Sequence, residues 1–160
     1  MSKLKKFIVL DFEGKSTKRP YNVGIIVGDK HGNIYRKYSI VFPETFQENI
    51  TTNNGTVSNR MSKNNIDYIM SNPLEFRSTT IENFTQFLFR LIELDNITEF
   101  WAYNMSFDKS ALKRLIGLEN FTKLCQQVTF YDIIPIVTPR LLTKKYVKFC
   151  TKHGYITKAK

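Results

Sequence analysis

The order of apolar and polar positions alternates between strand-like and helix-like stretches. Apolar runs predict strands over 5–11, 21–29 and 34–42, and the turn Asp29-Lys30-His31-Gly32-Asn33 makes these three an antiparallel meander. Further strands are predicted over 99–103 and 128–131, and helical spacing of apolar residues predicts helices over 61–71, 79–94, 106–116, 118–126 and 141–152. We therefore expect an α/β fold, with a mixed five-stranded sheet flanked by helices.

The whole chain, 1–160, is expected to form a single domain. Its hydrophobic content of 42% is enough for a full core, and we find no internal repeat. The polar stretch 43–60 predicts a long loop. No apolar run approaches the roughly 20 residues of a membrane helix, and the basic start enters a strand directly instead of a signal-peptide core. We expect an intracellular, cytoplasmic protein with no membrane partner.

The net charge of +10 favours a polyanionic partner, because clustered lysine and arginine residues attract phosphate backbones. The charge is concentrated near the carboxyl end. Asp132 is the last acidic residue, and it is followed by Arg140 and six lysines, several of them in the predicted basic helix over 141–152. The alternative is a solvated helix face, although such faces usually include acidic residues as well.

Two carboxylates follow the first predicted strand. Asp11 and Glu13 come directly after the apolar run Phe7-Ile8-Val9-Leu10, with Phe12 between them. Side chains two positions apart on a strand share a face, so both acids point the same way at the strand's carboxyl end. Together they could hold a hard divalent cation. The alternative is an ordinary solvated strand end.

A third carboxylate lies at the junction of the fourth predicted strand and the next helix. The segment Asn104-Met105-Ser106-Phe107-Asp108 places Asp108 in the first turn of that helix. The apolar stripe of the helix then leaves Asp108 at the same edge of the sheet as Asp11 and Glu13. Alternatively, Asp108 only complements the helix dipole.

These motifs resemble the DEDD-type 3′-to-5′ exonucleases of the ribonuclease H-like fold, which include proofreading subunits of DNA polymerases and ribonuclease T. Asp11-Phe12-Glu13 matches the first motif of that family, and Asn104-Met105-Ser106-Phe107-Asp108 matches the second. Val23-Gly24-Ile25-Ile26-Val27, Trp101-Ala102-Tyr103-Asn104 and Phe130-Tyr131-Asp132-Ile133 agree in order. The resemblance covers nearly the whole chain and implies a ribonuclease H-like sheet.

The resemblance implies hydrolysis of single-stranded DNA or RNA from 3′ ends with two Mg²⁺ or Mn²⁺ ions. Asp11 would bridge both ions, Glu13 would bind one and Asp108 the other. Asn104 and Phe107 would shape the substrate side. Phe12 would add an apolar contact to substrate, with packing in the core as its alternative role.

The chain departs from the family in its third motif, a His or Tyr followed by a fourth metal-binding Asp. No Asp or Glu follows Asp132, so His153 has no acidic partner downstream. Asp132 resembles a neighbouring structural acid more than the fourth ligand. We expect a C-terminally truncated domain, with self-association or a protein partner covering the surface that the missing segment would occupy.

Three hypotheses follow. The first is a nuclease whose remaining catalytic segment lies outside this chain or on a partner. The second is a nuclease-like module that binds nucleic acid or a protein without cutting. The third is an enzyme of the same fold with an unusual or single-ion site, in which three acids suffice for weak hydrolysis. The family implies two ions, but one or none is possible here.

Overall fold

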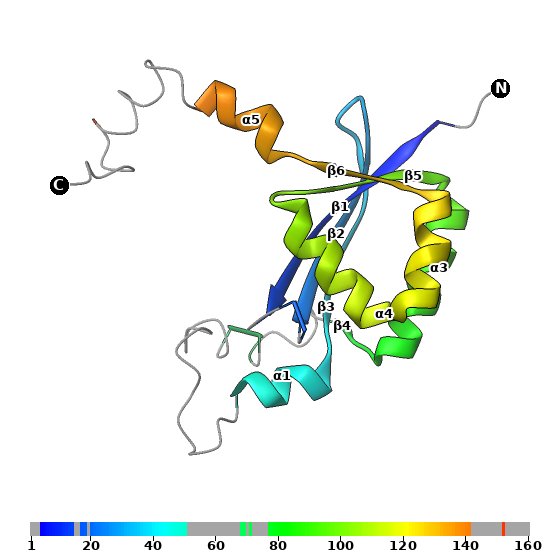
Figure 1. Ribbon diagram of the computed structural model, residues 1–160, viewed down its shortest axis with the longest axis vertical. Coiled ribbons are helices and arrows are strands. Elements are labelled where there is room, and N and C mark those ends of the chain that lie inside the picture. Colours follow the sequence, from blue (N-terminus) through cyan, green and yellow to red (C-terminus); the bar gives the residue numbers. More distant parts are fainter. Residues whose placement is uncertain are drawn as a thin grey trace.

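The computed structural model describes residues 4–14, 17–18, 20–50, 68–69, 71, 77–141 and 152. The strands are β1 (Lys6–Gly14), β2 (Pro20–Asp29), β3 (Ile34–Val41), β4 (Arg77–Ser78), β5 (Ile97–Ala102) and β6 (Thr129–Asp132). The helices are α1 (Pro43–Ile50), α3 (Ile81–Asp95), α4 (Met105–Gln127) and α5 (Ile134–Leu141). Figure 1 shows these elements in colours that follow the sequence.

The strands form one six-stranded mixed sheet in the order β4-β3-β2-β1-β5-β6. β1, β2 and β3 pair antiparallel, and the pairs β1–β5, β5–β6 and β3–β4 are parallel. This confirms the predicted meander and mixed α/β sheet. The prediction of five strands missed β4, because two residues are too short to show an alternating pattern.

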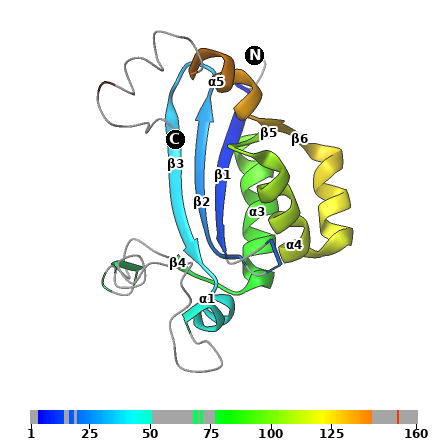
Figure 2. The same cartoon turned by 60° about the vertical axis from the view of Figure 1, so that its left-hand side comes forward.

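Helices α3 and α4 cover one face of this sheet (Figure 2). Ile8, Leu10 and Phe12 of β1 point into that side and are at most 3% exposed. From α3, Phe84 and Leu88 join the same core cluster. Complete burial of one such side chain is worth about 1.5–3 kcal/mol, so this layer holds β1 firmly at the centre of the sheet.

The opposite face of the sheet carries an aligned row of side chains, which we call the open face. Strand pairing puts Lys37, Ile26, Val9, Trp101 and Tyr131 side by side across β3, β2, β1, β5 and β6. The rings of Trp101 and Tyr131 stack at 4.5 Å. Two residues of this row, Ile26 and Tyr131, remain 37% and 38% exposed.

Three helical predictions need correction. Residues 43–50 begin the predicted loop but form α1, in which Pro43 suits the first helical position and Phe46 packs on Tyr21. The predicted helices over 106–116 and 118–126 are joined in α4, with a kink at Gly117, whose φ is 82°. Helix α5 was not predicted, because Pro135 within it is a poor helix former in general.

Three predictions fall largely outside the described residues. These are the remainder of the polar loop, 51–60, the helix over 61–71, and the basic helix over 141–152. In the part of the chain that the structure describes, no helix combines the length and apolar character of a membrane-spanning segment.

Candidate active site

Asp11 and Glu13 lie near the carboxyl end of β1, with their side chains exposed. The intervening Phe12 is 3% exposed and packs in the core, as the alternation predicts. The ring of Phe12 therefore contributes packing in this structure and offers no surface to a substrate. Asp11 also lines a hollow of 620 Å³ on β1, β2 and β3, here called the central hollow, which includes Val9, Ile26 and Lys37.

Asp108 connects helix α4 to the same end of β1. It lies in the first turn of α4, is 2% exposed, and its Oδ1 accepts a hydrogen bond of 2.8 Å from the backbone N–H of Phe12. Phe12 lies beyond the last paired position of β1 and β5, which is Val9 with Trp101. The carboxylate therefore binds the β1 backbone where β5 no longer accompanies it.

The pKa values of Asp108 and Glu13 are raised at this end of the sheet. Burial raises the pKa of Asp108 to about 6, and the negative charges of Asp11 and Glu13 act in the same direction, against the hydrogen bond from Phe12. The pKa of Glu13 is also raised, first by burial and then by Asp11. Negative charge is thus concentrated at this end of the sheet.

Carboxylate oxygens are ligands that Mg²⁺ and Mn²⁺ accept, so the donor chemistry of Asp11, Glu13 and Asp108 suits these ions. The side-chain arrangement is less complete. Among the described residues, no three His, Cys, Asp or Glu side chains are close enough together to hold a metal ion. The structure therefore supplies the donor types and a shared location, but not an assembled metal centre.

Asn104 and Phe107 flank Asp108 at the start of α4. Asn104 is exposed, and its backbone has the left-handed conformation, with φ 62° and ψ 58°. Its Oδ1 accepts a hydrogen bond from the Ser106 hydroxyl at 3.1 Å. Phe107 is half-buried against the main core. Asn104 thus has free surface for a ligand, whereas Phe107 divides its surface between core and solvent.

Asp132 binds the backbone of the turn between β5 and α4, where Asn104 lies. Its Oδ1 accepts hydrogen bonds from the backbone N–H groups of Asn104 (3.1 Å) and Ile134 (2.9 Å), and its Oδ2 accepts one from Met105 (3.2 Å). Both oxygens are therefore used by the backbone, which agrees with the structural role expected for this acid. The contact to the β5–α4 turn was not predicted, although a carboxylate ending a strand just before a helix was a usable signal.

Replacing Asp132 with Ala is expected to lower the free energy of unfolding by about 1–3 kcal/mol, because it removes three charge-assisted hydrogen bonds that backbone N–H groups donate to its carboxylate. Urea denaturation at neutral pH measures this. Glu119→Ala is the control, since Glu119 forms only an exposed pair with Lys123. A loss no larger than that of the control would contradict the proposed anchoring role.

No protein-family model and no curated protein sequence matches this chain. Among solved structures it is similar to an "ExoI/SSB-Ct complex", with a TM-score of 0.53, 12% identity, and coverage of 84% of this chain and 29% of that one. Complexes of E. coli exonuclease I with a dA16 and a 5cy-dA13 oligonucleotide give TM-scores of 0.50 and 0.52, both at 12% identity. They cover 83% and 88% of this chain, and 29% and 31% of theirs.

These comparisons define the class of fold. It is a ribonuclease H-like mixed α/β sheet with flanking helices. More particularly, it resembles part of E. coli exonuclease I, and this chain spans less than a third of the length of the matched chains. At 12% identity the likeness establishes the fold alone.

Proposed function

We propose that this chain forms the core of a metal-dependent 3′-to-5′ exonuclease that acts on single-stranded DNA or RNA. The observation that carries the proposal is the hydrogen bond from the Phe12 backbone to Asp108, which links the two acid-bearing segments at one end of the sheet. The likeness to exonuclease I structures that contain oligonucleotides supports the same reading.

In this proposal Asp11, Glu13 and Asp108 hold the metal. The ion, when bound, supplies a hydroxide nucleophile near neutral pH and stabilises the charge of the phosphodiester in the transition state. Asp11 and Glu13 are exposed and can change rotamer, whereas Asp108 is fixed by its backbone hydrogen bond. The two exposed acids would therefore adjust to a bound ion, and Asp108 would be its fixed ligand.

The remaining residues of the site orient the substrate. Asn104 projects from an exposed left-handed turn beside Asp108 and can bind a terminal nucleotide through its amide. Phe107 offers the exposed part of its ring to the same nucleotide. The net charge of +10 favours approach of a polyanion to the whole protein.

The His and fourth Asp of the family's third motif have no counterpart among these 160 residues, in which no acid follows Asp132. Two ions need more ligands than one, so three acids favour a site with a single tightly held ion. Full activity would then depend on a further acid from outside these residues.

A second candidate function is a module that binds nucleic acid without cutting it. The observation that favours it is the lack of an assembled metal-binding group among the described residues. In this case the acids at the end of β1 bind no metal ion, and nucleic acid binds through lysine and arginine side chains at the surface.

Degradation of a 5′-labelled single-stranded oligonucleotide tests the first function against the second. With Mg²⁺ or Mn²⁺, we expect a ladder that shortens from the 3′ end, and with EDTA we expect none. An intact but bound oligonucleotide in all conditions would favour the binding module. If the oligonucleotide is neither bound nor degraded, both functions are refuted.

A further inference from the structure

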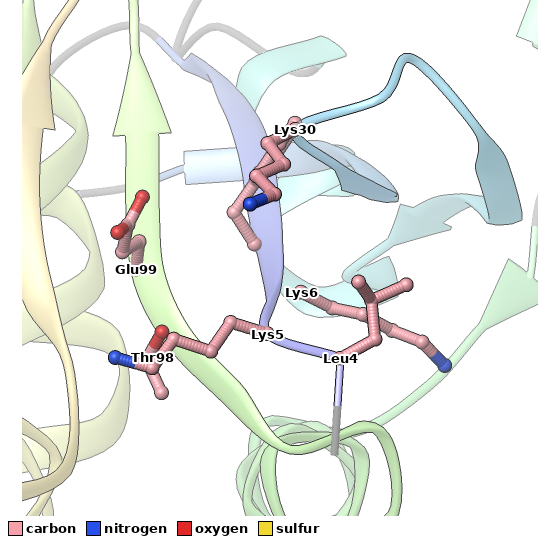
Figure 3. Close-up of a pocket in the computed structure, with 7 residues that line it drawn as sticks. Leu4, Lys5, Lys6, Lys30, Thr98 and Glu99 are labelled. Atoms are coloured by element: carbon pink, nitrogen blue, oxygen red, sulfur yellow. The ribbon is translucent and has the colours of Figure 1, made fainter. Parts of the chain in front are cut away.

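A second hollow lies at the opposite end of β1 from the carboxylates. This distal pocket, shown in Figure 3, has a volume of 390 Å³ and is lined by Leu4, Lys5, Lys6, Phe7, Lys30, Thr98 and Glu99. Its residues come from the start of β1, the turn after β2 and the start of β5. The pocket thus combines an apolar base at Phe7 with three lysines.

Two of the three lysines are available for a ligand. Lys6 donates to Asp95 at 2.7 Å and lies over the ring of Tyr35, so its charge is already used. Lys5 and Lys30 are exposed and make no ion pair with any described residue. The single acid of the pocket, Glu99, accepts a hydrogen bond of 2.9 Å from Trp101 Nε1.

The distal pocket lies on the same face of the sheet as the side chains of Asp11 and Glu13. Phe7, Val9 and Asp11 alternate with core residues along β1, so all three point to the open face. Phe7 lines the distal pocket, whereas Val9 and Asp11 line the central hollow together with Lys37. The two hollows therefore follow one strand, with exposed lysines beside both.

The net charge of the distal pocket argues for an extended ligand. Two available ammonium groups and one carboxylate give it only a weak positive charge, which is too little to hold a small anion against water and salt. Such a pocket contributes usefully as one contact among several on a polyanion, whose binding sums many phosphate contacts.

We propose that the distal pocket is a remote subsite for single-stranded nucleic acid, which runs from its 3′ end at Asp11 along the open face of β1 to Lys5 and Lys30. This inference rests on the proposed function, since it takes the carboxylates as the position of the 3′ end. Lys37 contacts a phosphate midway, and Phe7 and Ile26 provide apolar surface for bases and sugars.

The path has a defined length. Six residue steps of a strand separate Lys5 from Asp11, about 20 Å at the usual rise. A stacked single strand rises about 3.4 Å per nucleotide, so about six steps lead from the terminal nucleotide to the distal pocket, which is reached by about the seventh nucleotide from the 3′ end. Shorter strands can contact Lys37 but do not reach Lys5 and Lys30.

Binding of oligothymidylates of 3 to 12 nucleotides, labelled at the 5′ end and measured by fluorescence anisotropy in EDTA, tests this subsite. The double variant Lys5→Ala/Lys30→Ala is compared with Lys113→Ala/Arg114→Ala, which removes the same charge from exposed positions on α4, on the other side of the sheet. We expect the affinity of wild type to rise stepwise at about seven nucleotides.

In the Lys5→Ala/Lys30→Ala variant that step is lost, affinity for the 12-mer falls about 5–10-fold, and the salt dependence weakens by one to two phosphate contacts, at about 0.7 each on a logarithmic scale. The α4 variant keeps the step. A step retained in the first variant, or an equal loss in both variants, overturns the subsite while the proposed function stands. No binding or degradation of any strand by wild type overturns both.

Discussion

Replacing Asp11 with Asn is expected to reduce metal-dependent degradation of single-stranded oligonucleotides at least about 100-fold. Substituting a neutral amide removes one charged oxygen ligand, and metal ions supply several kcal/mol of transition-state stabilisation, where each 1.4 kcal/mol is a factor of ten. Asp11 is exposed, and Asn has nearly the same shape. The free energy of unfolding should therefore change by no more than about 0.5 kcal/mol.

The measurement is the initial rate of shortening of a 5′-labelled strand in Mn²⁺, together with a urea denaturation curve for each protein. Glu119→Gln, which also removes one exposed carboxylate but lies on α4 in an ion pair with Lys123, is the matched control and should keep the wild-type rate. If the Asp11→Asn protein degrades the strand at the wild-type rate, Asp11 is not part of the site and the proposed mechanism is wrong.

The positions of Asp11 and Glu13 could be predicted from the sequence, because the alternation of side chains along a strand is a local pattern. Asp11 and Glu13 follow an apolar run whose even-numbered residues are buried, and the pattern alone assigns the two acids to the other face. The approach of Asp108 required a further rule, that strand ends and helix starts meet at one edge of the sheet. Its hydrogen bond to Phe12 obeys that rule.

The features that could not be predicted depend on contacts between distant segments. β4 exists because Arg77 and Ser78 pair with the end of β3, and two residues carry no pattern of their own. The hydrogen bonds from Asn104 and Met105 to Asp132 join residues 28 and 27 positions apart. Local propensity does not encode contacts between residues so far apart in the sequence. These contacts form because β5 and β6 pair in parallel.

The open face is likewise a result of register. Single sequence positions do not reveal that Val9 aligns with Ile26 on one side and Trp101 on the other. Once aligned, these residues expose apolar surface beside the acids. That surface is consistent with either a nucleic-acid path or a covering partner, and the length-dependent binding experiment separates these two uses.

The carboxylate of Asp108 is expected to destabilise the metal-free protein at neutral and alkaline pH. Its pKa is raised from 3.8 to about 6 by burial and by Asp11 and Glu13, so the folded state favours the protonated form. Stability from this group is therefore fully present below about pH 4 and is lost as the pH rises through 6. A shift of about two pKa units corresponds to at most about 3 kcal/mol.

Replacing Asp108 with Asn should therefore stabilise the metal-free protein by about 1–3 kcal/mol at pH 8 and leave it nearly unchanged at pH 4, because the amide oxygen still accepts the Phe12 N–H without carrying charge. Urea denaturation in EDTA at both pH values measures this.

Asp108→Leu is the matched control, because it also removes the charge but leaves the Phe12 N–H without its acceptor. The Leu variant should therefore gain less stability than the Asn variant at pH 8 and should lose stability at pH 4. A loss of stability in Asp108→Asn at pH 8 would contradict the argument. This prediction bears on the proposed function, since a bound cation would offset the charge that weakens the metal-free fold.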